Sequence, residues 1–152
     1  MDNQSSNETR NPKLMQAMQD LKKHDNAYTR GVFAEALMEA HLLSPIERQT
    51  LLTEKEGPST RIRFEHIQNT EGEKFYLAFT DMDEYNKWNS DGKHNQALIM
   101  TMQEYGNILI RQINDLKGFV INPYGENVSV SKTLLLSLLK QHENKMNAKR
   151  GN

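Results

Sequence analysis

The sequence predicts a single α+β domain, in which an N-terminal helical hairpin precedes a mixed β-sheet with helices packed against it. Apolar residues recur at helical spacing over 12–45, whereas after residue 60 they alternate with polar residues at the period of a strand. Strands and helices then alternate over 97–141, as in a sheet covered by helices. The chain has 152 residues, which is the length of one ordinary domain.

The helical hairpin is predicted from two apolar stripes. Leu14, Met18 and Leu21 recur at spacings of four and three, and the preceding Pro12 suits a first helical turn. We expect Pro45 to stop the second helix, because proline lacks an amide hydrogen and restricts the residue before it. The apolar side of that helix, after Asp25–Asn26, comprises Val32, Phe33, Ala36, Leu37 and Ala40.

A β-hairpin is predicted after a loop over 51–60, which is charged at its centre and contains Gly-Pro. Ile62 and Phe64 alternate with charged residues, and a turn at 69–72 separates them from a second alternating stretch at 75–79. Alternation on both sides of a turn containing glycine is typical of two paired antiparallel strands.

A short helix and a strand follow this hairpin. Thr80–Asp81 supplies oxygen acceptors for a helix N-terminus, and the helix is expected to end near 91–92. A strand is predicted at 97–100. Thr101 and Glu104 then form a capping-box pattern that begins a helix through Ile108, Leu109 and Ile113.

The last part of the domain begins at Gly118, which we expect to end the preceding helix. A strand at 119–121, a turn at 122–125 and an extended segment at 128–130 follow. Ser131 is predicted to cap a final leucine-rich helix that frays from 141. The predicted boundaries are a disordered tail over 1–11, the domain over 12–141 and a polar C-terminal tail over 142–152.

Three segments resemble the N-terminal domain family of SseB, the enhanced serine sensitivity protein B. They are Phe75–Asp81 leading into Tyr85 and Trp88, then Ala97–Met102, and above all Gly118–Gly125 with its Asn-Pro turn. The likeness spans roughly residues 12 to 141. It implies a small cytoplasmic bacterial α+β protein without an assigned reaction, because the family name records a growth phenotype. Longer members carry a second domain, whose activities we do not expect here.

Composition excludes several kinds of site. The chain contains no cysteine, which rules out disulfides, thiolate zinc sites and a cysteine nucleophile. The 19 basic and 20 acidic residues give a net charge of -1, so the basic field typical of binding to nucleic acid or anionic membranes is missing. The N-terminus resembles no signal peptide, and we therefore expect a cytoplasmic protein.

Histidines and sequence motifs point to no catalytic residues, metal or cofactor. No phosphate loop, nucleophile elbow or dinucleotide-binding motif is present, which favours a non-enzymatic protein, although active sites also assemble from scattered residues. The five histidines are far apart and form no pair at helical i, i+4 spacing, namely His24, His41, His66, His94 and His142.

Carboxylates gather at Asp81, Asp83 and Glu84. Paired acids can bind a divalent cation or perform acid–base chemistry. We favour a structural interpretation, because acids in the first turn of a helix each stabilise it by up to about 1 kcal/mol. The alternative is a small-molecule binding protein or enzyme of amino-acid metabolism, with a site formed by Asp81, Asp83 and a histidine such as His94.

Basic residues form two small groups, Arg61 with Arg63 and, near the C-terminus, Lys145, Lys149 and Arg150. Alternation with Ile62 and Phe64 makes the arginine pair typical of the solvated face of a strand. No aromatic residues are interleaved with the C-terminal group, so we expect no nucleic-acid binding.

Aromatic residues provide the predicted contact surface. Trp and Tyr are enriched where proteins bind, and turns after strands in mixed sheets are frequent ligand positions. In the structural alternative, Asn122–Pro123 only shapes a turn. We interpret the chain as a non-enzymatic binding or adaptor module for a protein partner. The predicted binding patch consists of Trp88, Asn122, Pro123, Tyr124 and Gly125.

Overall fold

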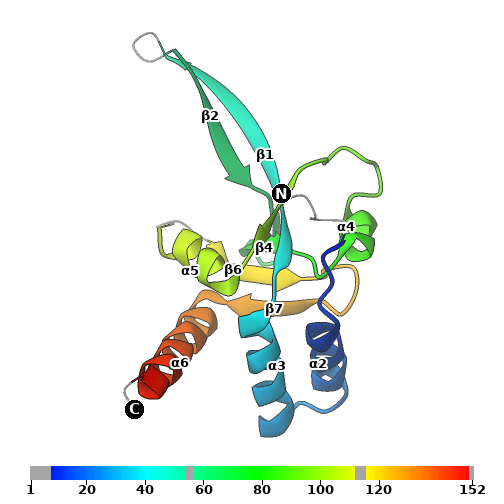
Figure 1. Ribbon diagram of the computed structural model, residues 1–152. Coiled ribbons are helices and arrows are strands. Elements are labelled where there is room, and N and C mark those ends of the chain that lie inside the picture. The colour runs from blue at the N-terminus through cyan, green and yellow to red at the C-terminus, as the bar shows by residue number, and fades with distance from the viewer. Residues whose placement is uncertain (1–7, 54–56, 112–115, 151–152) are drawn as a thin grey trace.

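The computed structural model describes residues 8–53, 57–111 and 116–150, in which the strands form two sheets (Figure 1). The first sheet has the order β2-β1-β5 and the second the order β3-β4-β6-β7. An isolated bridge between Leu43 and Phe79 joins the two sheets. The strands are β1 (Leu42–Thr53), β2 (Gly57–Phe64), β3 (His66–Gln68), β4 (Lys74–Ala78), β5 (Ala97–Met100), β6 (Leu116–Ile121) and β7 (Val128–Ser131).

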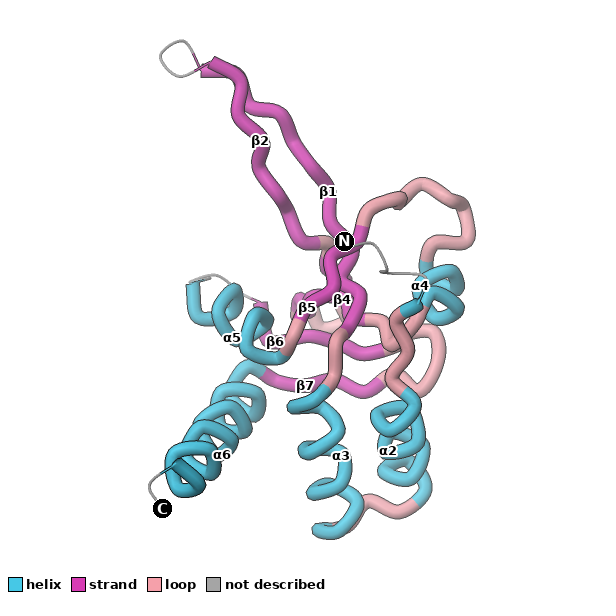
Figure 2. The backbone as a smooth tube through the Cα atoms, in the orientation of Figure 1, coloured by secondary structure: helices cyan, strands magenta, loops and turns pink. Residues whose placement is uncertain are grey.

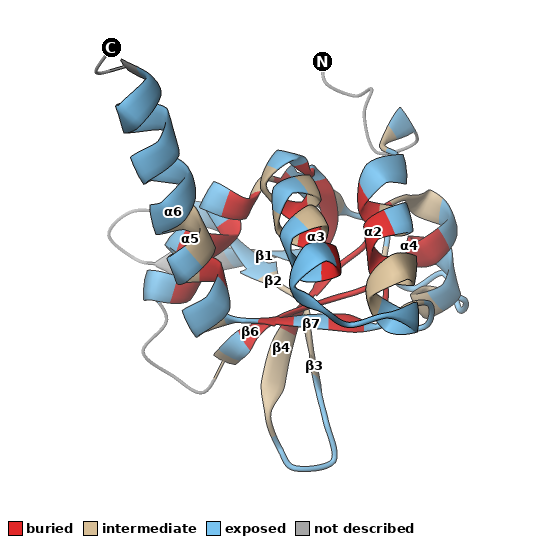
Figure 3. Ribbon diagram, turned by 90° about the horizontal axis from the view of Figure 1, so that it is seen from below, coloured by how far each residue is buried: buried red, intermediate tan, exposed pale blue. Residues whose placement is uncertain are grey.

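Helices pack against the four-stranded sheet, and the view from below shows α2, α3 and α6 on one side of it (Figure 3). The predicted α+β class and the N-terminal helical hairpin, α2 with α3, are confirmed. Within the described part of the chain, no helix is long and apolar enough to cross a membrane. The helices are α2 (Pro12–Lys23), α3 (Ala27–Glu39), α4 (Met82–Trp88), α5 (Met102–Arg111) and α6 (Lys132–Arg150).

The parallel pair of β4 and β6 lies at the centre of the larger sheet and is buried on both faces. Tyr76 and Phe119 pair in register and face the cluster formed with α2, α3, α5 and α6. Leu77 and Val120, one residue further along, face the second cluster with Leu43 and α4. The alternation of side chains along a strand thus divides one sheet between two apolar cores.

The prediction for residues 40–60 was wrong. The second helix ends at Glu39, and the expected loop instead belongs to the long strands β1 and β2. Pro45 marks the place where β1 changes neighbours, since Pro45 pairs with Ala97 of β5 and Ile46 pairs with Phe64 of β2. Proline is tolerated at such a junction because the regular ladder is interrupted there. Residues 54–56, at the centre of the expected loop, lie outside the described residues.

The predicted hairpin was right in its turn and wrong in one of its strands. The strand that pairs with β4 is β3, and the Asn69 side chain organises the turn by accepting from the amides of Glu71 and Glu73 (3.0 and 2.9 Å). Ile62 and Phe64 belong to β2 and pair with β1. Apolar alternation cannot distinguish these partners, because either pairing satisfies the same period.

Two further predicted boundaries differ from the structure. Gly118 does not end a helix, because it lies inside β6 with a φ of 157°. The final helix continues to Arg150 instead of fraying from 141. At the N-terminus, Asn11 is held by bonds from its Nδ2 amide to the carbonyl oxygens of His41 and Thr80 (2.9 and 2.8 Å). Residues 1–7 of the expected disordered tail, and Ile113 of the predicted helix, lie outside the described residues.

The local start signals for three helices are confirmed. Asp81 caps α4 by accepting from the Glu84 amide (3.0 Å), and Ser131 caps α6 by accepting from the Leu134 amide (3.1 Å). Before α5, the Glu104 amide donates to Thr101 Oγ1 (3.2 Å) and the Thr101 amide donates to the Glu104 carboxylate (2.8 Å). These oxygens satisfy amides that have no partner within the helix.

Because several tyrosine side chains are buried, we expect the free energy of unfolding to fall at alkaline pH. Burial raises the pKa of Tyr105, Tyr76 and Tyr85, and the Tyr105 ring stacks on Phe119 at 4.7 Å. Because folding raises these pKa values above about 10, the usual value for tyrosine, the neutral phenols stabilise the fold fully below that pH. We expect urea titrations to show a free energy of unfolding that falls as the pH rises above about 10.

The Tyr105→Phe variant tests the largest contribution to this loss. Its free energy of unfolding should fall less steeply above about pH 10 than that of the wild type, because the most deeply buried phenol has been removed. Below that pH the two proteins should show parallel dependences on pH. Equal alkaline slopes would contradict the role assigned to Tyr105.

Candidate functional site

Trp88 of the predicted patch is half-buried and belongs to an aromatic cluster. Its ring centroid lies 5.7 Å from Phe79, 5.9 Å from Tyr85 and 4.2 Å from the His94 imidazole. Part of the indole ring therefore packs against the second core. Trp88 can offer only part of its surface to a partner.

Asn122 is fully buried and joins the ends of β4 and β6. The Thr80 amide donates to its Oδ1, and its Nδ2 donates to Thr80 Oγ1, both at 3.0 Å. The Asn122 carbonyl accepts from the amides of Gly125 and Asn127 (2.8 and 2.9 Å), which closes the turn. Its φ is +50°, a left-handed conformation that asparagine tolerates better than most residues. Asn122 thus shapes the patch from beneath.

The turn brings Tyr124 to the surface and presses Gly125 against α4. Tyr124 is 65% exposed, and Pro123 is half-buried. A Cβ at Gly125 would collide with the Glu84 carboxylate, so a larger residue there would have to displace that side chain. The structure therefore places the turn beside α4. Among the described aromatic side chains, Tyr124 makes none of the ring contacts that surround Trp88.

Two buried polar atoms on α4 lack a hydrogen-bond partner among the described residues. Glu84 is 8% exposed, and one of its carboxylate oxygens accepts from the Lys87 ammonium (2.7 Å). The other oxygen, and the hydroxyl of Tyr85, have no hydrogen-bond partner in the described structure. Burial raises the pKa of Tyr85, and the charge of Glu65 adds to this effect. Of these two atoms, the Glu84 oxygen lies against Gly125 of the predicted patch.

Asp81 and Asp83 occupy structural positions at the start of α4. Asp81 accepts from the Glu84 amide and from the Thr80 hydroxyl, both at 3.0 Å, whereas Asp83 is exposed in the first turn. The described residues contain no group of three histidine or carboxylate side chains that could hold a metal ion. The geometry fits helix capping, which was the favoured interpretation of these acids.

His94 has a partner that sequence reasoning missed. Its Nδ1 lies 3.1 Å from a carboxylate oxygen of Glu65, and its ring lies against Trp88. Glu65 and His94 border an open hollow of about 260 Å³ between β1 and the segment before β5, also lined by Arg48 and Lys93. Because 29 residues separate Glu65 from His94, no local spacing could indicate the pair.

The largest projection of the molecule is the paired outer part of β1 and β2, residues 46–53 and 57–64, which we call the arm (Figure 2). Residues paired across antiparallel strands share a face, so the register defines the two faces of the arm. Arg61 and Arg63 are exposed on one face, as expected. The other face carries Arg48, Thr50, Leu52, Pro58, Thr60 and Ile62.

This second face of the arm exposes apolar side chains. Leu52 is 79% exposed and Ile62 is 40% exposed, although Ile62 was expected to face a core. The difference arises because most of the arm extends beyond the body, where no element covers it (Figure 1). Among the described residues, the arm meets the core at its base, through Ile46 and Phe64.

The fold therefore defines a small α+β domain in which helices cover a mixed sheet and a two-stranded arm projects from it. The chain matches the family described as SseB protein N-terminal domain over residues 14–136, and it belongs to that family. Neither a curated protein nor a solved structure matches it. The family match confirms the resemblance carried by the Asn-Pro turn.

Replacing Asn122 tests its structural role. Asn122→Ala leaves the buried Thr80 amide without its acceptor and keeps a left-handed backbone, so we expect a loss of about 2 to 4 kcal/mol in unfolding free energy. Asn127→Ala is the matched control, because Asn127 has a φ of +55° but an exposed side chain. It should cost about 1 kcal/mol. Equal losses in urea titrations would contradict the proposed role of the amide.

Proposed function

We propose that this chain is a cytoplasmic, non-enzymatic adaptor module of the SseB N-terminal type, which binds a protein partner through the arm. The observation that carries this proposal is the uncovered face of the arm that exposes Leu52 near its tip and Ile62 nearer its base. Exposed apolar surface on a projecting element is typical of an interaction site.

The physical state of the arm supports the same proposal. Two isolated strands are only marginally stable in water, because each pair buries little apolar surface. Over residues 58–64, β2 has β1 as its only neighbour among the described strands, so the outer edge of this part pairs with no described strand. A partner that packs on the apolar face would bury Leu52 and Ile62 and would stabilise the ribbon.

The predicted patch adds a second contact to the proposal. Tyr124 and Pro123 would touch the partner, Trp88 would offer its exposed edge, and Asn122 and Gly125 would hold the turn in position. The exposed phenol of Tyr124 supports this role, because tyrosine provides large contact area at low conformational cost.

The polar hollow at His94 favours the alternative function, a binding site for an amino-acid-related small molecule. Arg48 and Lys93 could bind a carboxylate, and Glu65 could bind an ammonium group. This site differs from the one imagined around Asp81 and Asp83, since the structure pairs His94 with Glu65. The same groups could also form a structural ion pair.

The arm is tested by a Leu52→Ser, Ile62→Ser double variant. Partners captured from a lysate of the source cell are compared with those of the wild type by mass spectrometry. We expect a stoichiometric partner whose affinity for the variant falls about tenfold or more, because both exposed apolar side chains of this face are lost. Circular dichroism should show an unchanged body, since both side chains lie on the arm.

Two further variants locate the contact. Tyr28→Ala is the matched control, because Tyr28 is 78% exposed on α3, away from the arm, and it should retain the partner. Tyr124→Ala tests the patch separately. Weaker binding of the partner to this variant would support the second contact. Full retention of the partner by the arm variant would overturn the role of the arm.

The alternative predicts thermal stabilisation by amino acids, with serine tested first. A ligand at a hundred times its Kd adds about 2.7 kcal/mol to the free energy of unfolding, which is about 5 to 11 °C in Tm for a chain of this size. His94→Gln should remove the shift, because it takes away the imidazole that pairs with Glu65 in the hollow. No shift in the wild type would exclude the amino acids tested.

A further inference from the structure

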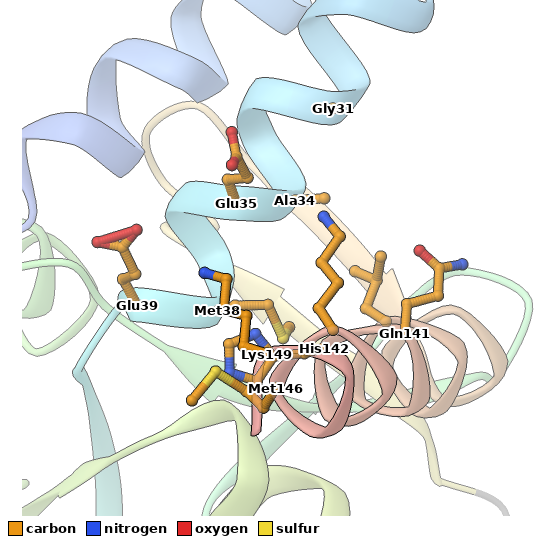
Figure 4. A pocket seen from close by; sticks show the side chains of 11 residues that line it. Gly31, Ala34, Glu35, Met38, Glu39, Gln141, His142, Met146 and Lys149 are labelled. Carbon is orange, nitrogen blue, oxygen red and sulfur yellow. The ribbon is translucent and has the colours of Figure 1, made fainter. Parts of the chain in front are cut away.

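A groove of about 350 Å³ lies between α3 and α6, on the opposite part of the molecule from the arm (Figures 1 and 4). Its apolar lining includes Met38 on α3 with Leu138 and Met146 on α6. A Cβ built on Gly31, which also lines the groove, would meet no atom within 4 Å. The groove therefore has open space for a side chain at Gly31.

Opposite charges border the two sides of this groove. Glu35 and Glu39 lie on α3, and we call them the α3 strip. Lys145 and Lys149 lie on α6, and we call them the α6 strip. Each strip has a spacing of four residues, which places both charges on one helical face. Among the described residues, no ion pair joins the two strips.

Among the described residues, no element covers the C-terminal half of α6. Residues 140–149 are exposed, and Figure 3 shows this half of the helix extending away from the body. A helix of about ten residues is marginal in water without packing, because few hydrogen bonds offset the cost of nucleation. Met146 is 40% exposed on the side that lines the groove. This half of α6 is therefore suited to packing against another molecule.

We propose that the occupant of the groove is α6 of a second copy of this chain. The sequence of α6 supplies what the groove needs, a methionine beside two lysines four residues apart. In a two-fold dimer, the α6 strip of each copy would meet the α3 strip of the other, and Met146 would pack on Met38 and Leu138. A two-fold interface requires such a self-complementary surface.

This self-association is independent of the arm and of the adaptor function proposed above. The ion pairs would lie at the rim of the interface, where charges define orientation and specificity more than affinity. The methionines supply adaptable apolar contact at its centre. The two copies would leave both arms free, because the arm and the groove lie on opposite parts of the molecule.

The test uses two charge-reversed variants. One reverses the α3 strip with Glu35→Lys and Glu39→Lys, and the other reverses the α6 strip with Lys145→Glu and Lys149→Glu. We expect the wild type to sediment as a dimer at about 100 µM and each variant alone to raise the dimer Kd about tenfold or more, because strips of like charge then face each other.

Mixing the two variants distinguishes contacts between copies from contacts within one copy. In a heterodimer the new lysines of one variant meet the new glutamates of the other, and the unchanged strips also pair with opposite charges. We therefore expect an equimolar mixture to recover the dimer. Failure of the mixture to dimerise would overturn the proposal.

Two more variants control for net charge and for the groove itself. Glu47→Lys with Glu71→Lys changes the net charge as the α3 reversal does, but at exposed sites outside the groove, and it should leave the dimer intact. Gly31→Trp should fill the groove and weaken the dimer without any change in charge. If the wild type is monomeric at about 100 µM, the proposal is overturned. The alternative occupant of the groove is then a helix of another protein.

Discussion

The parallel pairing of β4 with β6 is the constraint on which the rest of the structure depends. Because both faces of this pair are buried, the helices on one side and α4 on the other pack against the same two strands. At Gly118 a Cβ would collide with the carbonyl oxygen of Val130, so glycine is what allows β7 to approach β6. Asn122 then joins the ends of the central strands. Both apolar cores therefore pack against the same two strands, β4 and β6.

The exposed arm exists because β1 pairs with two different strands along its length. Up to Pro45 the strand pairs with β5 against the body, and beyond it the strand pairs only with β2. The body covers the first part, but nothing covers most of the second. The apolar face of the arm is thus a direct consequence of one strand serving two neighbours. A strand that ended at Pro45 would remove the arm, together with the buried Ile46 at its base.

Local signals in the sequence predicted local structure well, whereas pairing over long distances could not be deduced. Asp81, Thr101 and Ser131 were identified as caps because a cap depends on residues three positions away. The partner of Ile62 was missed because the same alternation fits β1 or β4. Asn122 was assigned to the surface, since sequence cannot show that a polar side chain satisfies buried amides. The Glu65–His94 pair was missed because 29 residues separate its two members.

The polar groups nearest the second core mostly have structural partners, which directs attention to the projecting elements. Asp81 is engaged in capping, Asn122 in joining strands, and His94 with Glu65. The arm and the outer half of α6 carry side chains that no contact within the described chain explains. Both elements are marginal by themselves, since neither a lone hairpin nor a short helix buries much surface. Their extension from the body is understandable if binding, to a partner or to a second copy, supplies the missing burial.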